Sequence, residues 1–370
     1  MPQKPLIEAF ERIVSAKESS LTSICCGRYI LCDLTIFLCF ESCLEMHEIV
    51  IPPASEDINP LRIHIEYNFA LVRNEILPSK KRQKVFHYTD AAGLKGILET
   101  GKIWATHFEF LNDEKEILHG AELFKEYEEE ILLQHPIIKS KKNYMHAEII
   151  RRFMHDTGYN AYLFCTCKRN NKLNQFRYYS GSSGACAIEF NTNKLLSVLP
   201  DVNGTPEKSL IINVEYNSNN QIKKCRYIVE LFYGLLDAIL EYYGEDVDSS
   251  NEYLMLVLAS YRYYKLLCCL SFKHSSFEEE EEIRFVFLSP KLLSTPTLVP
   301  NFRVSKFGLS PYLDINIWNP KTHEYRLPVK SITVGPIGQK ELFQKSIELL
   351  LQKQNIKRVS VNMDSMPYRS

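Results

Sequence analysis

The sequence predicts an α+β fold. Short apolar runs of strand character are scattered among longer stretches with helical periodicity, and they do not alternate regularly with helices as the strands of a doubly wound sheet do. The chain has 370 residues, of which 45% are hydrophobic and 12% aromatic, so it can bury a full core. It shows no internal repeat. This length and composition suggest one large domain with an appendage.

The first 80 residues are expected to form a helical N-terminal extension of unknown role, followed by the main domain over 81–370. Residues 1–51 have a helical pattern, and the segment IPPASEDINP, with three prolines, ends it. The next segment, LRIHIEYNFALV at residues 61–72, alternates in the manner of a strand. A basic run at residues 80–84 is interpreted as a solvated linker.

The main domain opens with a strand, a helix and a second strand. The strand covers residues 85–88; the helix over 91–99 starts after Asp90, a typical N-cap, and ends near Gly101; the second strand covers 103–106. The rest of the chain contains charged segments with helical periodicity and apolar segments of strand character. Further helices are predicted at 114–133, 142–155, 226–243, 251–270 and 340–354, and further strands at 161–168, before Phe190, and at 210–216, 283–288, 331–336 and 358–363. The helical segment 222–270 is treated as an insertion into the main domain.

Charge and cysteine content restrict the partners and the compartment. The net charge of −1 and the pI near 6.8 provide no overall field for nucleic acid, which stays a possible partner that is not favoured. The 11 cysteines form no paired zinc motif, and the start of the chain lacks a secretory pattern. A cytoplasmic protein, or an effector delivered without a classical signal peptide, is expected. The apolar stretch 24–44 carries Arg28, Asp33 and Glu41, which indicates core packing and no membrane span.

Four polar stations stand out along the predicted elements. They are His87-Tyr88-Thr89, Asn112-Asp113, Tyr178-Tyr179 and Glu280-x-Glu282-x-Arg284. In a strand, residues two apart share one face, so Glu280, Glu282 and Arg284 are expected to point the same way. Each station also has a structural interpretation. Without any function, His87 would be a core histidine and the two tyrosines would be packed aromatic residues. The glutamates would be a solvated run, and Asn112-Asp113 would be a helix N-cap.

Together these stations resemble a bacterial family called domain of unknown function 2971. The resemblance rests on HYT followed by GLKGIL, a Gly-Lys turn, IWAT and FLND, and on the later segments FRYYSGSSGACAIEF, SFEEEEEIR and VNMDSMPYR. It extends from about Val85 to the end of the chain. Phe176 and Phe277 stand where the family usually has tryptophan, and Tyr178 where it often has histidine. These exchanges keep aromatic surface.

The first part of the motif is also similar to the ADP-ribosyltransferase superfamily, in particular the DarT type. This resemblance implies a split mixed β-sheet with helical insertions, NAD as co-substrate and no metal. It implies that His87, with Tyr88 and Thr89, grips the NAD ribose, and that Tyr179 or Tyr178 stacks on nicotinamide. Glu282 would be the catalytic carboxylate, Glu280 would prepare the acceptor, and Arg284 would bind pyrophosphate or neutralise the glutamates. His87 and Glu282 are therefore expected to face one cleft.

The resemblance implies an enzyme, and it suggests a toxin or effector. It would cleave the nicotinamide–ribose bond and transfer ADP-ribose to an unidentified macromolecule, a protein rather than a nucleic acid. Nicotinamide leaves as a neutral molecule, so the carboxylate is needed to stabilise positive charge on the ribose. Three alternatives stay open: an NAD glycohydrolase, a non-catalytic module that binds a nucleotide or a partner, and a thiol hydrolase that uses Cys165 or Cys167.

Overall fold

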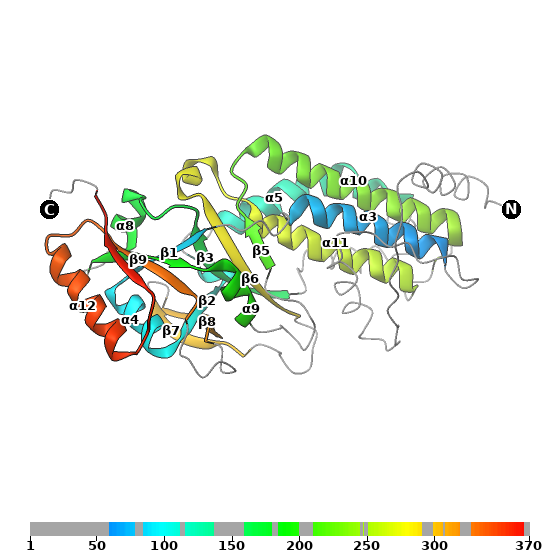
Figure 1. The fold of residues 1–370 in the computed structure, drawn as a ribbon. Coiled ribbons are helices and arrows are strands. Elements are labelled where there is room, and N and C mark those ends of the chain that lie inside the picture. Colours follow the sequence, from blue (N-terminus) through cyan, green and yellow to red (C-terminus); the bar gives the residue numbers. More distant parts are fainter. Residues whose placement is uncertain are drawn as a thin grey trace, which may run out of the picture. The chain divides into compact units, whose positions relative to one another are not determined.

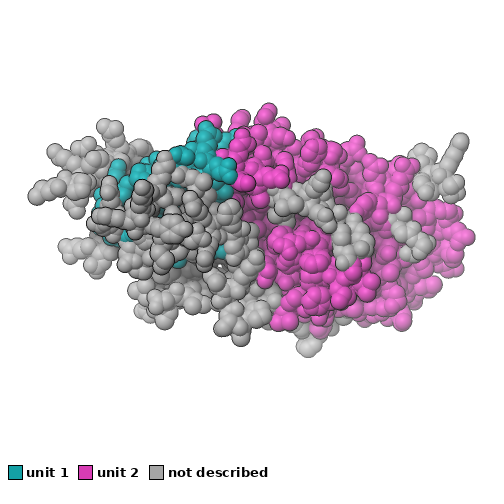
Figure 2. All heavy atoms as spheres, turned by 180° about the vertical axis from the view of Figure 1, so that it is seen from behind, with its two compact units in different colours: residues 1–72, 127–156, 227–262 teal, residues 73–126, 157–226, 263–370 magenta. Residues whose placement is uncertain are grey.

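The computed structural model confirms an α+β protein with a mixed sheet and several helices (Figure 1). It describes residues 59–77, 84–111, 115–136, 159–179, 184–199, 210–244, 247, 251–290, 299–305, 308–318 and 327–365. The helices predicted within 1–51 and at 142–155, and the apolar stretch 24–44, lie outside these residues. The chain divides into two compact units that are interleaved in sequence (Figure 2). Unit 1 comprises residues 1–72, 127–156 and 227–262, and unit 2 comprises the remainder.

The regular secondary structure in the described residues of unit 1 is helical. It contains parts of α3 (Pro60–Ile76), α5 (Lys115–Glu130), α10 (Ser218–Tyr243) and α11 (Glu252–Ser271). Two of these helices, α10 and α11, are those predicted within residues 222–270. They pack through Phe232 and Tyr261, whose rings stack with centroids 4.3 Å apart, and the Tyr261 hydroxyl donates to Glu128 Oε1 at 2.5 Å.

The strand predicted at residues 61–72 is wrong, because this segment lies within helix α3. Leu61, Ile65 and Phe69 are buried at a spacing of four residues, which is the period of a helix face. The helix also has a proper start. Asn59 Oδ1 accepts from the backbone N–H of Leu61 at 2.9 Å, and Pro60 occupies the first helical position, where its missing N–H does no harm.

Helix α11 is long and apolar enough to cross a membrane, judged by length and composition alone. In the structure, 72% of its 18-residue apolar window is buried inside the protein, and buried core helices meet the same criterion.

Unit 2 contains a mixed ten-stranded sheet. Its main order is β10-β9-β4-β1-β3-β2-β8-β7, and β6 pairs with both β3 and β5. The strands are β1 (Val85–Asp90), β2 (Lys102–His107), β3 (Tyr159–Cys167), β4 (Ala185–Phe190), β5 (Leu210–Asn213), β6 (Glu282–Pro290), β7 (Asn301–Ser305), β8 (Gly308–Asn316), β9 (Val329–Val334) and β10 (Ser360–Met363). Only the β9–β10 pair is parallel among these strands.

The sheet forks at β3. One edge of β3 pairs with β6 along its whole length, from Tyr159 opposite Pro290 to Cys167 opposite Glu282. The other edge is shared, because β2 pairs with it at Tyr162 and Leu163 whereas β1 pairs with it only at Cys167. The strands β1 and β2 thus meet the same edge of β3 at different points, and the sheet has two arms.

Helices cover the two faces of the sheet unequally. Apolar residues of α4 (Ala91–Thr100), α9 (Thr192–Val198) and α12 (Lys340–Lys353) join the larger core on one face (Figure 1). The predicted caps of α4 are confirmed, since Asp90 accepts from the Gly93 N–H and Gly101 has a φ of 64°. On the opposite face, the short helix α8 (Leu173–Tyr179) packs through Phe176 against Tyr88 and Cys167. The candidate site lies on this second face.

Candidate functional site

A buried ion pair begins strand β6. Ile283, Phe285 and Phe287 point into the core, as predicted, which turns Glu282 and Arg284 to the other face. Arg284 donates from Nε to Glu282 Oε1 at 3.1 Å and from Nη2 to Oε2 at 2.9 Å. Its Nη1 donates to the Leu270 carbonyl at 2.8 Å. With exposures of only 5% and 1%, Glu282 and Arg284 form a bidentate pair that is shielded from water.

Lys273 joins this pair to a second carboxylate. Its Nζ donates to Glu280 Oε2 at 2.6 Å and to Glu282 Oε2 at 3.3 Å, and its side chain is almost buried. Burial alone would raise the pKa of Glu282, but the charges of Arg284 and Lys273 and the Arg284 hydrogen bond lower it. Glu282 is therefore ionised at neutral pH. Lys273 was not predicted from the sequence, although a lone lysine between an apolar helix and a run of glutamates marks a candidate counter-ion.

Glu280 was predicted to open the same strand as Glu282 and Arg284, but it lies outside β6. It ends a 3₁₀ helix, η6 (Ser275–Glu280), and the next residue, Glu281, has a φ of 46° in the left-handed region. This turn breaks the alternation that would have placed Glu280 and Glu282 in one strand register. The two carboxylates nevertheless converge, because both bind Lys273.

Cysteine and tyrosine side chains surround the Glu282 carboxylate. The Cys165 thiol hydrogen-bonds to it, and the Tyr216 hydroxyl accepts from the Glu282 backbone N–H at 2.9 Å. Burial first, then the nearby Cys165 and Glu282, raises the pKa of Tyr179. Burial and the charges of Glu282 and Glu280 raise the pKa of Cys167. A Cys167 thiolate is disfavoured in these surroundings, so the thiol hydrolase alternative gains no support from this residue.

A groove of about 480 Å³ opens beside Glu280. One wall comes from α8 and the residues before it, and the other from η6. The lining residues are Asn171, Lys172, Leu173, Asn174, Gln175, Tyr178, Ser276, Phe277, Glu279 and Glu280. Tyr178 is 60% exposed, so its ring is available to a ligand. Glu282 is not among the lining residues, so of the two predicted glutamates only Glu280 borders the groove.

His87 points to the other face of the sheet, so the prediction that it faces one cleft with Glu282 is wrong. It pairs with Ile188, a member of the larger core, and its ring lies 4.5 Å from that of Phe164. Glu282 pairs with Cys167, which pairs with Phe86. Because paired residues share a face and adjacent residues point to opposite faces, Glu282 and His87 lie on opposite sides.

The imidazole of His87 has a structural partner at the fork of the sheet. Its Nδ1 lies 3.0 Å from the carbonyl oxygen of Cys165, on the stretch of the β3 edge between its pairings with β1 and β2. Burial lowers the pKa of His87 from 6.5 to about 4, against the opposing effect of this hydrogen bond. His87 is thus neutral at pH 7, and its hydrogen bond links β1 to β3 at the fork of the sheet.

Tyr88 and Thr89 also serve the fold. The Tyr88 hydroxyl donates to the Arg169 carbonyl at 2.8 Å and accepts from the Lys172 N–H at 3.0 Å, so it holds the loop that leads into the groove wall. Thr89 lies on the face of His87 and packs against the first turn of α4, where a Cβ on Gly93 would meet its Oγ1 at 2.0 Å. The structure places neither side chain among the groove residues.

Two further points concern residues singled out from the sequence. Asn112-Asp113 lies outside the described residues. Within the described part of the chain, no three His, Cys, Asp or Glu side chains are grouped closely enough to hold a metal ion.

Comparison with known proteins supports part of the family resemblance. The family described as "Protein of unknown function (DUF2971)" matches residues 175–285, which is less than half of the chain. The match includes Tyr178, Tyr179, Glu280, Glu282 and Arg284 and ends before the β7–β8 hairpin; it does not include His87. No curated protein and no solved structure matches the chain. Over residues 175–285, which carry the buried ion pair and six of the ten residues that line the groove, the chain is therefore similar to a family of unknown function.

Proposed function

We propose that unit 2 binds NAD in the groove beside Glu280, cleaves the nicotinamide–ribose bond and transfers ADP-ribose to a macromolecule, a protein rather than a nucleic acid. The observation that carries this proposal is the composition of the groove. A carboxylate held by a nearly buried lysine, Glu280, lines the same hollow as the exposed ring of Tyr178. An aromatic face suits a nicotinamide or adenine ring, and a fixed carboxylate suits the positive charge that develops on ribose.

The chemistry needs few groups. The C–N bond between ribose C1′ and nicotinamide breaks, and its electron pair neutralises the pyridinium ring, so the leaving group requires no acid. The cationic C1′ centre is stabilised by the Glu280 carboxylate until an acceptor oxygen or nitrogen forms the new bond. The acceptor gives up one proton, for which Glu280 is a suitable base. Asn171 borders the same groove and can hydrogen-bond to ribose hydroxyls.

This proposal moves the role of the catalytic carboxylate from Glu282 to Glu280. Both oxygens of Glu282 accept hydrogen bonds from Arg284, and its carboxylate is shielded from water. A carboxylate engaged in this way supports the site by fixing Lys273, which in turn orients Glu280. Glu280 is therefore assigned as the reacting carboxylate and Glu282 as a positioning residue.

The decisive test compares two neighbouring glutamates of the groove. Purified protein is incubated with labelled NAD and a cell lysate, and nicotinamide release and label on protein and on nucleic acid are measured. Glu280→Gln should lower nicotinamide release about 10²–10³-fold. The matched control, Glu279→Gln, changes a carboxylate of the same groove that accepts from Asn174 instead of Lys273, and should retain most activity. Release without transfer would identify an NAD glycohydrolase.

A non-catalytic binding module is the second candidate, and the buried Glu282–Arg284 pair favours it. A carboxylate satisfied by its own arginine needs no substrate to explain it. This candidate predicts that NAD binds, with no release of nicotinamide above the uncatalysed rate, and that Glu280→Gln does not alter this result. Absence of NAD binding by the wild-type protein would contradict both candidates.

A further inference from the structure

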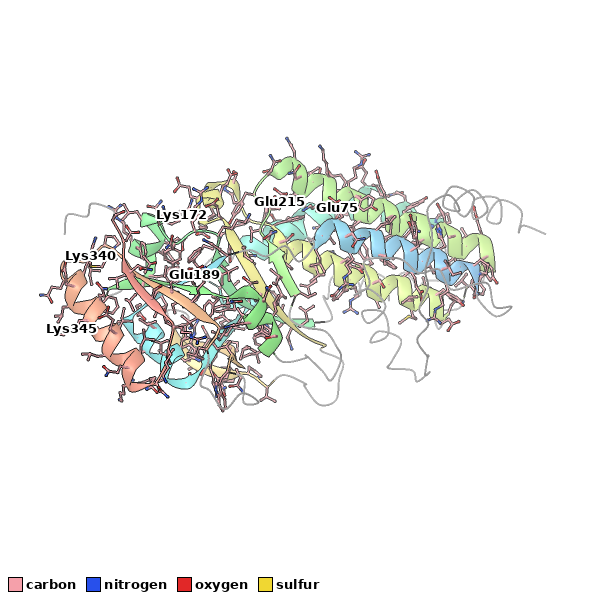
Figure 3. The ribbon with its side chains drawn as sticks, viewed as in Figure 1. Glu75, Lys172, Glu189, Glu215, Lys340 and Lys345 are labelled. Carbon is pink, nitrogen blue, oxygen red and sulfur yellow. The ribbon has the colours of Figure 1, made fainter. Side chains whose placement is uncertain are left out.

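Glu281 ties together the two walls of the groove. Its Oε2 lies 3.0 Å from Arg169 Nε and 2.9 Å from Lys172 Nζ, and its carbonyl accepts from the Lys168 N–H at 3.0 Å. The cations belong to the segment that precedes α8, whereas Glu281 belongs to the turn between η6 and β6. Lys172, labelled at the start of α8 in Figure 3, also lines the groove. The carboxylate of Glu281 therefore occupies a cationic position at the edge of the groove.

The Glu281 carboxylate has unfavourable contact geometry, and the Glu281 backbone has an unfavourable conformation. Its Oε2 is shielded from solvent, yet neither close contact has the geometry of a hydrogen bond. Its backbone adopts a φ of 46°, a conformation that favours glycine and disfavours residues with a side chain. Backbone strain of this kind persists where surrounding contacts enforce it and is often found at ligand sites. An incoming anion with better hydrogen-bond geometry at Arg169 and Lys172 would relieve the first of these defects.

The charges at this edge suit an anion with more than one negative charge. Arg169 and Lys172 face a single carboxylate. The neighbouring carboxylates have their own partners, since Glu280 accepts from Lys273 and Glu279 from Asn174. Two cations can satisfy a phosphate or pyrophosphate group more fully than the one carboxylate they now contact. Arg284, expected from the family resemblance to bind pyrophosphate, is 1% exposed and engaged by Glu282 and the Leu270 carbonyl.

We propose that Arg169 and Lys172 form a phosphate-binding subsite of the groove, which the Glu281 carboxylate fills when no ligand is bound and leaves when a pyrophosphate group enters. The inference rests on the proposed function for the identity of that pyrophosphate as part of a dinucleotide. Binding of the inorganic anion itself does not depend on any reaction.

The experiment measures the affinity of the full-length protein for inorganic pyrophosphate by titration calorimetry. Glu281→Gly removes the carboxylate and allows the left-handed backbone without strain, and Glu281→Gln removes the charge while keeping the size of the side chain. Both variants should bind pyrophosphate about three- to tenfold more tightly, because the Glu281 carboxylate no longer competes for the two cations. Lys172→Gln should weaken binding about tenfold or more. The control is Glu278→Gln, an exposed residue that lines a different hollow beside Tyr216.

Each outcome decides the proposal. Unchanged affinity in both Glu281 variants, retention of full affinity in Lys172→Gln, or equal tightening in Glu278→Gln would overturn it, as would absence of pyrophosphate binding in all variants. Thermal melting of each variant verifies that it is folded, and Glu281→Gln keeps the test intact if the glycine variant is unstable. If the affinities of the variants for pyrophosphate change as predicted but no variant releases nicotinamide from NAD, the phosphate-binding subsite is supported and the proposed reaction is refuted.

Discussion

Replacing Arg284 by methionine tests how much the buried ion pair between Arg284 and Glu282 contributes to the stability of unit 2. The substitution removes both hydrogen bonds to Glu282 and leaves a carboxylate of 5% exposure with Lys273 at 3.3 Å as its cation. Breaking one side of a buried pair typically costs 3–5 kcal/mol because the remaining charge stays buried. We expect the free energy of unfolding at pH 7 to fall by about 4 kcal/mol, a large part of the 5–15 kcal/mol typical of a folded domain.

Urea denaturation followed by circular dichroism measures this loss. The double variant Arg284→Met, Glu282→Leu removes both charges and should recover most of the stability, since apolar residues often replace a buried pair without cost. Lys95→Gln is the control, because it breaks an exposed pair with Glu99 one helical turn away and should cost about 0.5 kcal/mol or less. A loss below about 1 kcal/mol in Arg284→Met, or a double variant as unstable as the single one, would refute the reasoning.

The same pair predicts a pH dependence. The folded pKa of Glu282 lies below its unfolded value, which is about 4.3 for a free glutamate. Its stabilising contribution is therefore complete above that value and is lost as the pH falls through the folded pKa. In Arg284→Met this acid-dependent part of the unfolding free energy should shrink.

Three other perturbations test particular contacts. His87 has a folded pKa of about 4, below the unfolded value of about 6.5, so its contribution to stability should rise with pH across this window by up to about 1.4 kcal/mol per pH unit. His87→Asn should reduce the slope of the unfolding free energy by this contribution, and an unchanged slope would contradict the assignment. Gly96→Ala in α4 meets nothing within 4 Å and should raise the melting temperature, whereas Gly120→Ala would place its Cβ 2.8 Å from the Cys269 Cα and should lower it; the opposite order would show that the helix packing is misjudged. Tyr216→Phe leaves the Glu282 N–H without its acceptor and should cost about 1–3 kcal/mol in urea denaturation, so a neutral result would argue for another acceptor.

Elements with an unambiguous period could be predicted from the sequence. Helix α12 and strand β3 have strong patterns, and they were expected within about two residues of their observed bounds. Residues 61–72 could not be assigned correctly because LRIHIEYNFALV satisfies both an alternating pattern and a four-residue helical spacing. Packing of Leu61, Ile65 and Phe69 decides for the helix.

The β7–β8 hairpin was missed for a different reason. Pro311 argues against a strand, because proline cannot donate to a ladder. In the structure, the pairing of β8 with β2 ends at Tyr312, so Pro311 falls beyond that ladder and pairs only with Phe302 on β7. The location of an edge or a ladder end depends on tertiary structure, and a local sequence pattern does not contain it.

The position of His87 illustrates the limit of motif reasoning. The sequence correctly places it on a strand that begins the main domain, but the face it occupies depends on the register of β1 against β3 and β4. A single-residue change of register would reverse that face. Glu282 and His87 lie 195 residues apart in sequence (282 − 87), so no local signal could specify their relation.

The run FEEEEE is the part of the sequence whose interpretation changes most. A run of glutamates ordinarily indicates a solvated surface, since like charges repel and prefer water. Here successive carboxylates have different partners: Glu279 accepts from Asn174, Glu280 from Lys273 and Glu282 from Arg284, and Glu281 forms ion pairs with Arg169 and Lys172. Glu280, Glu281 and Glu282 are paired with cations, whereas Glu279 accepts from a neutral amide. Arg284 belongs to the same strand as its partner, and the other partners come from segments outside the run. Two of these contacts, from Glu279 to Asn174 and from Glu281 to Arg169 and Lys172, link the segment that begins with η6 to α8 and the residues before it, so they join the two walls of the groove.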